Sequence, residues 1–203
     1  MDCGVIVDDE DFFANYLRHC GRRTDVVCGG VKPQPPRGNS RESLRYNYEK
    51  RHFDTHPAEI RARQPYLSFR TTNFLIRKEV MVRTGINEDF RTFGYEDVDF
   101  GRRLQAAHAG ILHIDNPVSY YEYEDNATYL RKIEESLRTL SAHRDTLRRY
   151  SPLLTTLHRL RPILPLIRLF HRLAQEWERR NLTGRHPSLW VLRLYKMGYF
   201  LSL

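Results

Sequence analysis

The stretch TTNFLIRKEVMVRTGINEDFRTFGYEDVDFGRRL, residues 71–104, carries the pattern that decides the fold class. Its first eight residues predict a strand, because a short apolar run is bounded by polar residues. The next residues predict a short helix that ends at Gly85, and a loop then leads into a second helix. In that second helix Phe100, Leu104 and Ala107 share one face. Strands that alternate with helices are typical of an α/β domain.

Three carboxylates stand close together at the start of the second helix, in the run GYEDVDFG. Glu96, Asp97 and Asp99 have the side chains of a general base, of metal ligands or of partners for sugar hydroxyls. They are equally typical of a first helical turn, where the helix dipole favours negative charge. Phe93 and Tyr95 lie just before them and provide flat faces on which a sugar ring can stack. Both interpretations stay open on spacing alone.

Outward from this stretch, short apolar runs predict further strands at 2–7, 25–31 and 111–114. Residues 8–23 predict a helix, because acids crowd its first turn and apolar residues recur at helical spacing. Gly110 is expected to cap the helix that precedes the strand at 111–114. The first 120 residues therefore predict an α/β fold.

The composition of the chain changes at about Asn126, where the strand pattern ends and leucines begin to alternate with arginines and prolines. We therefore expect one α/β domain over 1–125 and a helical, basic C-terminal extension over 126–203. Within the first domain, 44–69 is polar and aromatic with weak periodicity. We expect irregular or partly helical structure there, near a binding surface.

The chain has 203 residues and a formal net charge of +8, which favours anionic partners such as nucleic acid, acidic lipid or phosphate-bearing small molecules. Its three cysteines include no C-x-x-C pair, so neither a disulfide framework nor a zinc knuckle is expected. No apolar stretch approaches the roughly 20 residues of a spanning helix. We expect a cytoplasmic protein, peripheral at most to the inner face of the membrane.

The basic C-terminal extension leaves two interpretations open. Arginines interleaved with leucines are typical of a helix that lies on an anionic membrane surface. The alternative is a helical subdomain packed on the core, whose arginines form a solvated face. A nucleic-acid partner is not expected, because the sequence shows no helix-turn-helix or RNA-binding motif.

Side chains of the metal-binding type occur at two further places. Asp2 lies next to a predicted strand, and the ends of strands are where α/β sheets bind ligands. His113 and Asp115 are metal ligands by type. A histidine in a buried strand is, however, more often a hydrogen-bonded core residue.

Four segments together resemble the C-terminal half of a family 2 glycosyltransferase with the GT-A fold. They are DCG with VIVDDEDFFANYL, VVCGGV, the block from TTNFL to GRRL, and ILHIDNPVSYYEYEDNATYLRKIEESL, and they cover roughly 2–140. The third segment is the most specific, since its Gly-Tyr-Glu-Asp is similar to the signature of the galactosyltransferase C-terminal domain. The resemblance implies a partial GT-A sheet, which is Rossmann-like, with flanking helices. The N-terminal, nucleotide-binding part of the family domain is expected to lie outside this sequence.

The resemblance also implies roles for particular residues. Asp97 would be the general base that takes the proton of the acceptor hydroxyl, and Glu96 would help to bind the acceptor. We expect Tyr95, Phe93 and Asn73 to contact the substrates. A base has to come within hydrogen-bond reach of the acceptor oxygen.

In that family an Asp-x-Asp motif holds Mg²⁺ or Mn²⁺ on the donor diphosphate, often with a histidine after the last strand. Asp2 matches the first aspartate, whereas Gly4 stands at the second and Tyr120 at the expected histidine. The resemblance thus implies a divalent cation with Asp2 as its one matching ligand. A single carboxylate is a poor magnesium site.

The implied function is transfer of a sugar from a nucleotide-sugar donor to a hydroxyl of a glycan acceptor, in bacterial surface glycan synthesis. Whether the chain acts as an enzyme stays open, because the metal motif departs from the family pattern. The alternative is a non-catalytic remnant, or an interaction module that binds a partner or a membrane surface through its basic helical tail.

Overall fold

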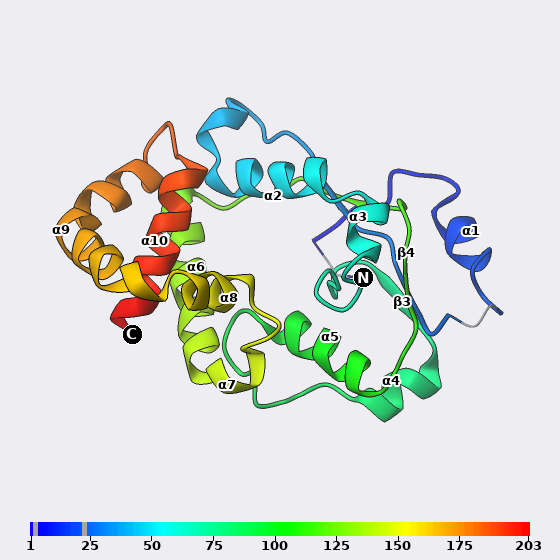
Figure 1. Cartoon of the computed structure of the whole chain (residues 1–203). Coiled ribbons are helices and arrows are strands. Elements are labelled where there is room, and N and C mark those ends of the chain that lie inside the picture. The colour runs from blue at the N-terminus through cyan, green and yellow to red at the C-terminus, as the bar shows by residue number, and fades with distance from the viewer. Residues whose placement is uncertain (2–3, 22–23) are drawn as a thin grey trace. The chain divides into compact units, whose positions relative to one another are not determined.

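The structure is a computed structural model that describes residues 1, 4–21 and 24–203 (Figure 1). The chain forms two compact units, which we call the sheet unit and the helical unit. The sheet unit consists of Met1–Pro35, Glu49–Glu88 and Glu96–Glu122. The helical unit consists of Pro36–Tyr48, Asp89–Tyr95 and Tyr123–Leu203. The helical unit thus takes in two segments that precede the predicted boundary at 125, and that boundary stays a prediction.

The described chain has mixed α/β structure, in which helices predominate and the sheets are small. In the sheet unit, β1 (Val26–Cys28) lies between β3 (Phe74–Ile76) and β4 (Ile111–His113). β1 runs antiparallel to β3 and parallel to β4. A second parallel pair joins β2 (Val31–Pro33) to β5 (Val118–Tyr120). The strands predicted at 25–31, 71–78 and 111–114 are confirmed in type.

The same two segments of chain form both parallel pairs. β2 follows β1 in one segment, and β5 follows β4 in the other. Cys28 lies opposite His113 in the first pair. The ladder continues past the strand ends, where the amide of Ile114 donates to the carbonyl of Cys28 at 2.9 Å. Gly29 and Gly30 separate β1 from β2. Backbone pairing continues through this connection, because the amides of Asn116 and Val118 donate to the carbonyls of Gly29 and Gly30 at 3.1 and 3.3 Å.

Side chains of β1 alternate between two apolar clusters, as the two-residue period of a strand requires. Val26 and Cys28 belong to a cluster that contains Phe100 and Leu104 of α5 (Glu96–Ala106) and Val80 of α4 (Lys78–Thr84). Val27, which points the other way, packs with residues of α1 (Phe12–Leu17). Both faces of the small sheet are thus covered by helices.

The segment at 2–7 departs from its prediction. Residues 2–3 lie outside the described residues, and of the rest only Ile6 pairs, through a single antiparallel bridge to Ser119. Ile6 is 53% exposed, whereas Val5 and Val7 pack on the cluster of α1. The prediction of a buried strand was therefore wrong for 4–7, because this segment buries only one of its faces.

Some of the predicted helix ends are confirmed, and others are not. Gly85 caps α4 with a φ of +63°, in the left-handed region that glycine favours, as predicted. α5 buries Phe100 and Leu104, also as predicted. The residue that follows α5 in the left-handed region is His108, with a φ of +51°, and not Gly110. The predicted helix at 8–23 is shorter, since α1 spans six residues.

The segment at 44–69 contains more helix than expected. α2 (Leu44–Thr55) begins in the helical unit and continues into the sheet unit. α3 (Ala58–Ala62) follows it in the sheet unit. The mostly polar α2 buries only Leu44 and Tyr46, so its sequence carries little of the periodicity that marks an amphipathic helix.

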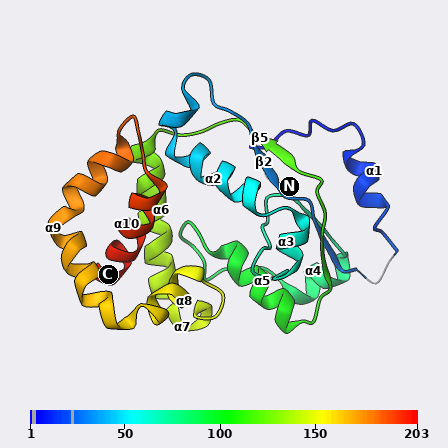
Figure 2. The same cartoon turned by 45° about the horizontal axis from the view of Figure 1, so that its top comes forward.

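The helical unit is built around three helices, α6 (Asn126–Ala142), α9 (Leu164–Thr183) and α10 (Leu189–Ser202). α9 packs along α10, and both contact α6 (Figure 2). Shorter helices complete the unit, namely the 3₁₀ turns η1 (Ser40–Glu42) and η2 (Arg161–Ile163), α7 (Arg144–Leu147) and α8 (Pro152–Arg159). Its fully buried side chains are Leu44, Leu130, Leu137, Leu140, Leu147, Leu182, Leu192, Tyr195 and Glu178.

A polar cluster connects the three long helices inside this core. Glu134 of α6 accepts a hydrogen bond from Tyr195 Oη of α10 at 2.5 Å and pairs with Arg179 of α9. Arg179 also donates to Tyr195 Oη at 2.8 Å. Each polar group in the cluster has a partner, so its burial costs little. Within the described residues, no helix combines the length and the apolar composition needed to cross a membrane.

Candidate functional site

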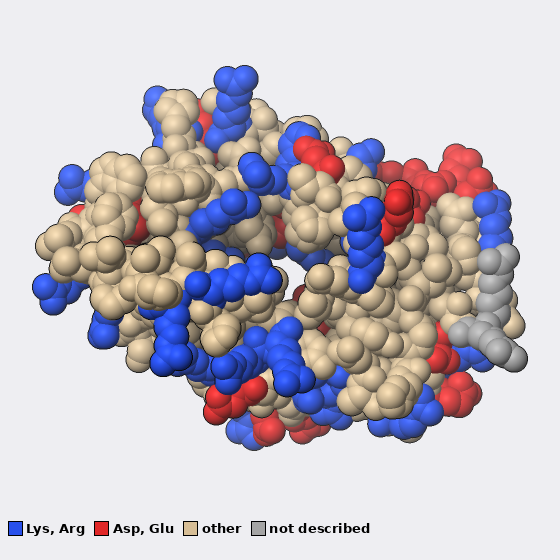
Figure 3. Space-filling model, in the orientation of Figure 1, with Lys and Arg blue, Asp and Glu red and all other residues tan. Residues whose placement is uncertain are grey.

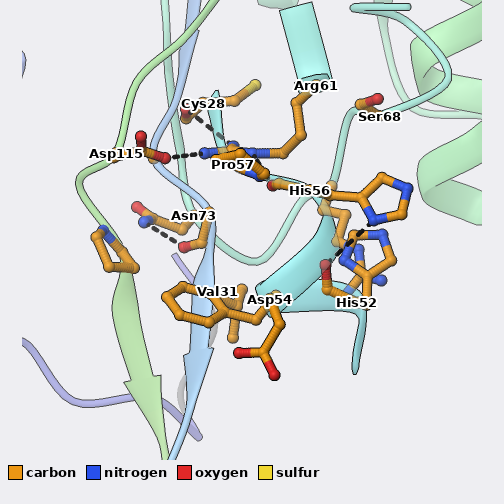
Figure 4. Close-up of a pocket in the computed structure, with 15 residues that line it drawn as sticks. Cys28, Val31, His52, Asp54, His56, Pro57, Arg61, Ser68, Asn73 and Asp115 are labelled. Carbon is orange, nitrogen blue, oxygen red and sulfur yellow. Dashed lines mark hydrogen bonds and ion pairs between the residues drawn. The ribbon is translucent and has the colours of Figure 1, made fainter. Parts of the chain in front are cut away.

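A pocket of about 320 Å³ opens at the carboxyl ends of β1 and β4 (Figure 4). Its walls come from the β1–β2 and β4–β5 connections and from α2, α3 and the segment that precedes β3. All of the residues that line it belong to the sheet unit. The carboxyl end of a parallel strand pair is the usual place for a ligand in an α/β sheet. The expectation of a binding surface near 44–69 agrees with this position.

Arg61 of α3 lies against Gly30, in the connection between β1 and β2, and is 7% exposed. Its Nη2 donates to the carbonyl of Ile114 at 2.9 Å and to Oδ1 of Asp115 at 3.2 Å. Its Nε donates to the carbonyl of His56 at 3.2 Å. The guanidinium therefore joins α3 to the end of β4 and places a buried positive charge in the pocket wall (Figure 4).

Asn73, which we expected at the substrate, is buried and uses its amide within the fold. Its Oδ1 accepts from Tyr16 Oη at 2.6 Å, and its Nδ2 donates to the carbonyls of Gly30 and Asn116 at 2.8 and 2.9 Å. Asn73 also lines the pocket. These three bonds make it a connector between α1, β2 and the β4–β5 connection, while its contact with substrate stays a prediction.

Two histidines and an arginine form the side of the pocket next to α2. The rings of His52 and His56 are stacked with centroids 4.4 Å apart. Burial, with further contributions from the charges of Arg70 and His56, lowers the pKa of His52 to about 4. His52 is therefore neutral at pH 7. Arg70 donates to Oε2 of Glu49 at 3.0 Å.

Asp97, the predicted base, lies in the first turn of α5 and is half-buried. Burial raises the pKa of its carboxyl to about 6; the charge of Arg70 opposes this rise, and that of Glu96 adds to it. The amide of Val98 donates to Oδ1 of Asp97 at 2.7 Å. Arg70 lines the pocket, so its charge acts on both the pocket and the Asp97 carboxyl.

The other two acids of the run differ from Asp97. Glu96 is exposed. Asp99 is 1% exposed. It accepts a hydrogen bond from Nε of Arg102 at 2.8 Å and a longer one from Nδ2 of Asn87 at 3.3 Å. Asp99 is thus a helix-start acid, as interpreted, but a buried and paired one. Asp97 is partly buried and forms no ion pair among the described residues, whereas its pKa is raised to about 6.

Phe93 and Tyr95, the predicted aromatic platform, belong to the helical unit and are described within it. The Phe93 ring is 50% exposed, and Lys132 Nζ lies 5.8 Å from its centroid. Its amide donates to Oε1 of Glu135 at 3.3 Å. Tyr95 has a φ of +70°, an unusual conformation for a residue with a side chain. Their contact with substrate stays a prediction.

The predicted metal positions come together in part. A Cβ atom added to Gly4 would lie 3.9 Å from the ring of Tyr120, so these two positions are neighbours. Asp2 lies outside the described residues. Neither glycine nor a neutral phenol is a good ligand for Mg²⁺, so the residues at these two positions do not fit the cation that the resemblance implies. Among the described residues, no group of three or more His, Cys, Asp and Glu is placed to hold a metal ion.

His113 and Asp115 have structural partners. His113 is 5% exposed, and its Nε2 pairs with the carbonyl of Pro65 at 3.0 Å. Burial lowers the pKa of this histidine, so it is neutral at pH 7. Asp115 accepts a hydrogen bond from the amide of Ala58 at 2.8 Å and pairs with Arg61. The interpretation of His113 as a hydrogen-bonded core residue is confirmed.

Sequence reasoning did not single out Arg61 or Arg70, although both line the pocket. Two signals pointed toward them. The pair Gly29–Gly30 between apolar runs marks a place where another group approaches the backbone closely. The polar and aromatic segment 44–69, which contains Arg61 and ends just before Arg70, was expected near a binding surface, but nothing in the pattern distinguished these two arginines from their neighbours.

No protein-family model matches the chain, and neither a curated protein nor a solved structure matches it. The function proposed below rests on the residues and on the geometry of the sheet unit.

Proposed function

We propose that the chain carries the acceptor side of a family 2 glycosyltransferase with a GT-A fold, and that Asp97 is its general base. The observation that carries the proposal is the carboxyl of Asp97, which has a pKa of about 6 and responds to the charge of Arg70. Arg70 lines the pocket, although Asp97 itself does not. The order of segments in 71–104 supports the same assignment, since it resembles the acceptor-side block of that family.

The raised pKa suits the chemistry. At pH 7 a carboxyl with a pKa of about 6 is roughly nine-tenths ionised, so it is ready to accept a proton. It also holds that proton roughly a hundred times more tightly than an ordinary aspartate does, which makes it a stronger base. Asp99 is already committed to Arg102, and Glu96 is exposed. Asp97 is therefore the carboxylate best suited to proton transfer.

The proposed step is a displacement at the anomeric carbon of the donor sugar. The acceptor oxygen forms a bond to that carbon while its proton passes to the carboxylate of Asp97. The bond between the anomeric carbon and the diphosphate breaks, and the nucleoside diphosphate leaves with the electron pair. The proton on Asp97 is then released to solvent, which regenerates the base.

The decisive experiment measures release of nucleoside diphosphate from a panel of nucleotide sugars, with glycan acceptors. It is run on the chain alone and on the chain joined to any coding sequence that precedes it in frame. Asp97→Asn, which keeps the shape and removes the base, should reduce the rate by a factor of about 10²–10⁴. Glu88→Gln, at an exposed acid of the loop before α5, is the matched control and should leave the rate unchanged. Transfer at the full rate by Asp97→Asn would remove the role of Asp97.

A chain that binds a sugar nucleotide without transferring the sugar is the second candidate. Gly4 and Tyr120 favour it, because they are neighbours that replace two expected ligands of the diphosphate cation. Calorimetric titration with nucleoside diphosphates and nucleotide sugars distinguishes the two candidates. Equal binding by the native chain and by Asp97→Asn, with no diphosphate released by either, would favour the second candidate.

A further inference from the structure

One face of α9 presents apolar side chains to solvent. Leu166 and Leu173 are 67% and 76% exposed, and Trp177 is 55% exposed. Together with Leu169 and Phe170, they recur at intervals of three and four residues, so they form one stripe along the helix. We call these five residues the α9 stripe. The opposite side of α9 is buried through His171, Glu178 and Leu182, so the stripe is not part of the core of the helical unit.

Beside the stripe, a groove of about 910 Å³ runs between α9 and α10. Arg168 and Arg172, one turn apart on α9, line it together with Arg161. Leu169 lines the groove and belongs to the α9 stripe, so the apolar and basic surfaces are continuous. Among the described residues that line the groove, none is Asp or Glu. Figure 3 shows Lys and Arg side chains spread over the C-terminal helices.

We propose that α9 docks the chain on an anionic phospholipid bilayer. The α9 stripe enters the boundary between headgroups and acyl chains, and the arginines of the groove bind lipid phosphates. An apolar stripe that contains a tryptophan and is flanked by arginines is the arrangement of a helix that lies in a membrane interface. Arginine binds phosphate through two parallel donors, which suits a headgroup at the edge of the stripe.

The charge of the surface decides between the possible occupants. A second copy of the chain would bring its own arginines to the same face, and those like charges would oppose the contact. An anionic lipid surface instead attracts every arginine that approaches it. The proposal does not depend on glycosyl transfer, since it concerns residues of the helical unit only.

The test is flotation of the whole chain with two kinds of vesicle. One is pure phosphatidylcholine, and the other contains a third of phosphatidylglycerol. We expect at least tenfold tighter binding to the anionic vesicles at low salt, with a loss of binding as salt screens the charges. Equal binding to both kinds, or no binding to either, would overturn the proposal.

Two pairs of variants separate the apolar contribution from the basic one. Leu166→Ser with Leu173→Ser should reduce vesicle binding at least tenfold, whereas Val82→Ser with Ile86→Ser should not. The control residues are 74% and 68% exposed but belong to the sheet unit.

Arg168→Gln with Arg172→Gln should reduce binding to anionic vesicles more than Lys78→Gln with Arg83→Gln. Both pairs lower the net charge by two, and the control residues are exposed on α4. Equal losses in the two pairs would mean that net charge, and not the groove, attracts the membrane, and would overturn the groove as the lipid site.

Trp177 reports the contact directly. In a Trp190→Phe background it is the only tryptophan of the chain, and its emission should shift to the blue and be quenched by brominated lipid. Sedimentation of the chain without vesicles completes the test. A dimer that Leu166→Ser with Leu173→Ser dissociates would assign the stripe to a second copy and overturn the membrane proposal.

Discussion

Arg61 lies against Gly30, whose absent side chain leaves the space that the guanidinium fills. A Cβ atom added to Gly30 would stand 3.1–3.3 Å from three atoms of that guanidinium. Gly30 also has a φ of +89°, in the region that L side chains rarely adopt. The glycine and the arginine are therefore two parts of one arrangement, which builds part of the pocket wall.

Gly30→Ala tests this arrangement. Gly38 has a φ of +94° with nothing within 4 Å of an added Cβ, so Gly38→Ala measures the backbone cost alone. We expect Gly38→Ala to lower the free energy of unfolding by about 1–2 kcal/mol. Gly30→Ala should cost roughly another 1–2 kcal/mol, because Arg61 must also move. Urea denaturation measures the free energy of unfolding of both variants. An equal loss in the two would show that the Arg61 guanidinium moves away from the added methyl group at no cost.

Asp97→Asn should stabilise the protein at neutral pH. Burial raises the pKa of this carboxyl to about 6, so the folded state disfavours the charge that it carries at pH 7. The amide has no such charge, and its free energy of unfolding should be higher by about 2 kcal/mol. Thermal unfolding at pH 7.5 should show a melting temperature several degrees above that of the native chain.

The pH dependence of that gain follows from the direction of the shift. A carboxyl whose pKa is raised in the folded state contributes full stability below its unfolded pKa near 3.8 and loses it as pH rises through about 6. The difference between Asp97→Asn and the native chain should thus be small near pH 4, grow between 4 and 6, and stay constant above. A difference that does not vary with pH would contradict the raised pKa.

Arg70→Gln should raise the pKa of Asp97 further. The charge of Arg70 opposes the effect of burial on that carboxyl, so its removal leaves burial and Glu96 unopposed. Titration of the Asp97 carboxyl carbon by NMR should show a pKa above 6. The matched control is Arg63→Gln, at an exposed arginine that follows α3, which should leave the titration unchanged. A lower pKa in Arg70→Gln would show that Arg70 acts on Asp97 by another route.

The local pattern predicted the elements whose residues contact one another nearby in the chain. Both α4 and α5 were expected. A terminal glycine, Gly85, marks the end of α4, and apolar residues at helical spacing mark α5. β2 and β5 were not expected as separate strands, because they pair with each other across a long stretch of chain, with Val31 opposite Val118. No local pattern contains such a contact.

The acids at the start of α5 also differ for reasons that local sequence patterns do not contain. Spacing alone makes Asp97 and Asp99 equivalent first-turn residues. The difference lies in their partners, since Asp99 meets Arg102 one turn on and Asn87 from the preceding loop. The pKa of Asp97 is instead affected by the charge of Arg70, which lies 27 residues earlier in the chain. Only the fold brings these two residues near enough for this effect.

The core of the helical unit contains a buried contact between a histidine and a glutamate, whose contribution to the free energy of unfolding can be measured. His171 Nδ1 lies 2.6 Å from Oε2 of Glu178, and the two side chains are 3% and 0% exposed. Burial raises the pKa of Glu178, while its contact with His171 opposes that rise. The pair joins positions two turns apart on α9, and His171 also packs edge-on against the ring of Tyr195.

A double-mutant cycle measures the coupling of this pair. His171→Phe leaves Glu178 buried without its partner, so we expect a loss of about 3–5 kcal/mol in the free energy of unfolding. Glu178→Leu should cost less, because it removes the buried acid itself. The double variant should be more stable than His171→Phe alone, since no buried acid then remains unpaired. Urea denaturation of the four proteins gives the coupling energy, and strictly additive losses would show that the two side chains do not stabilise each other.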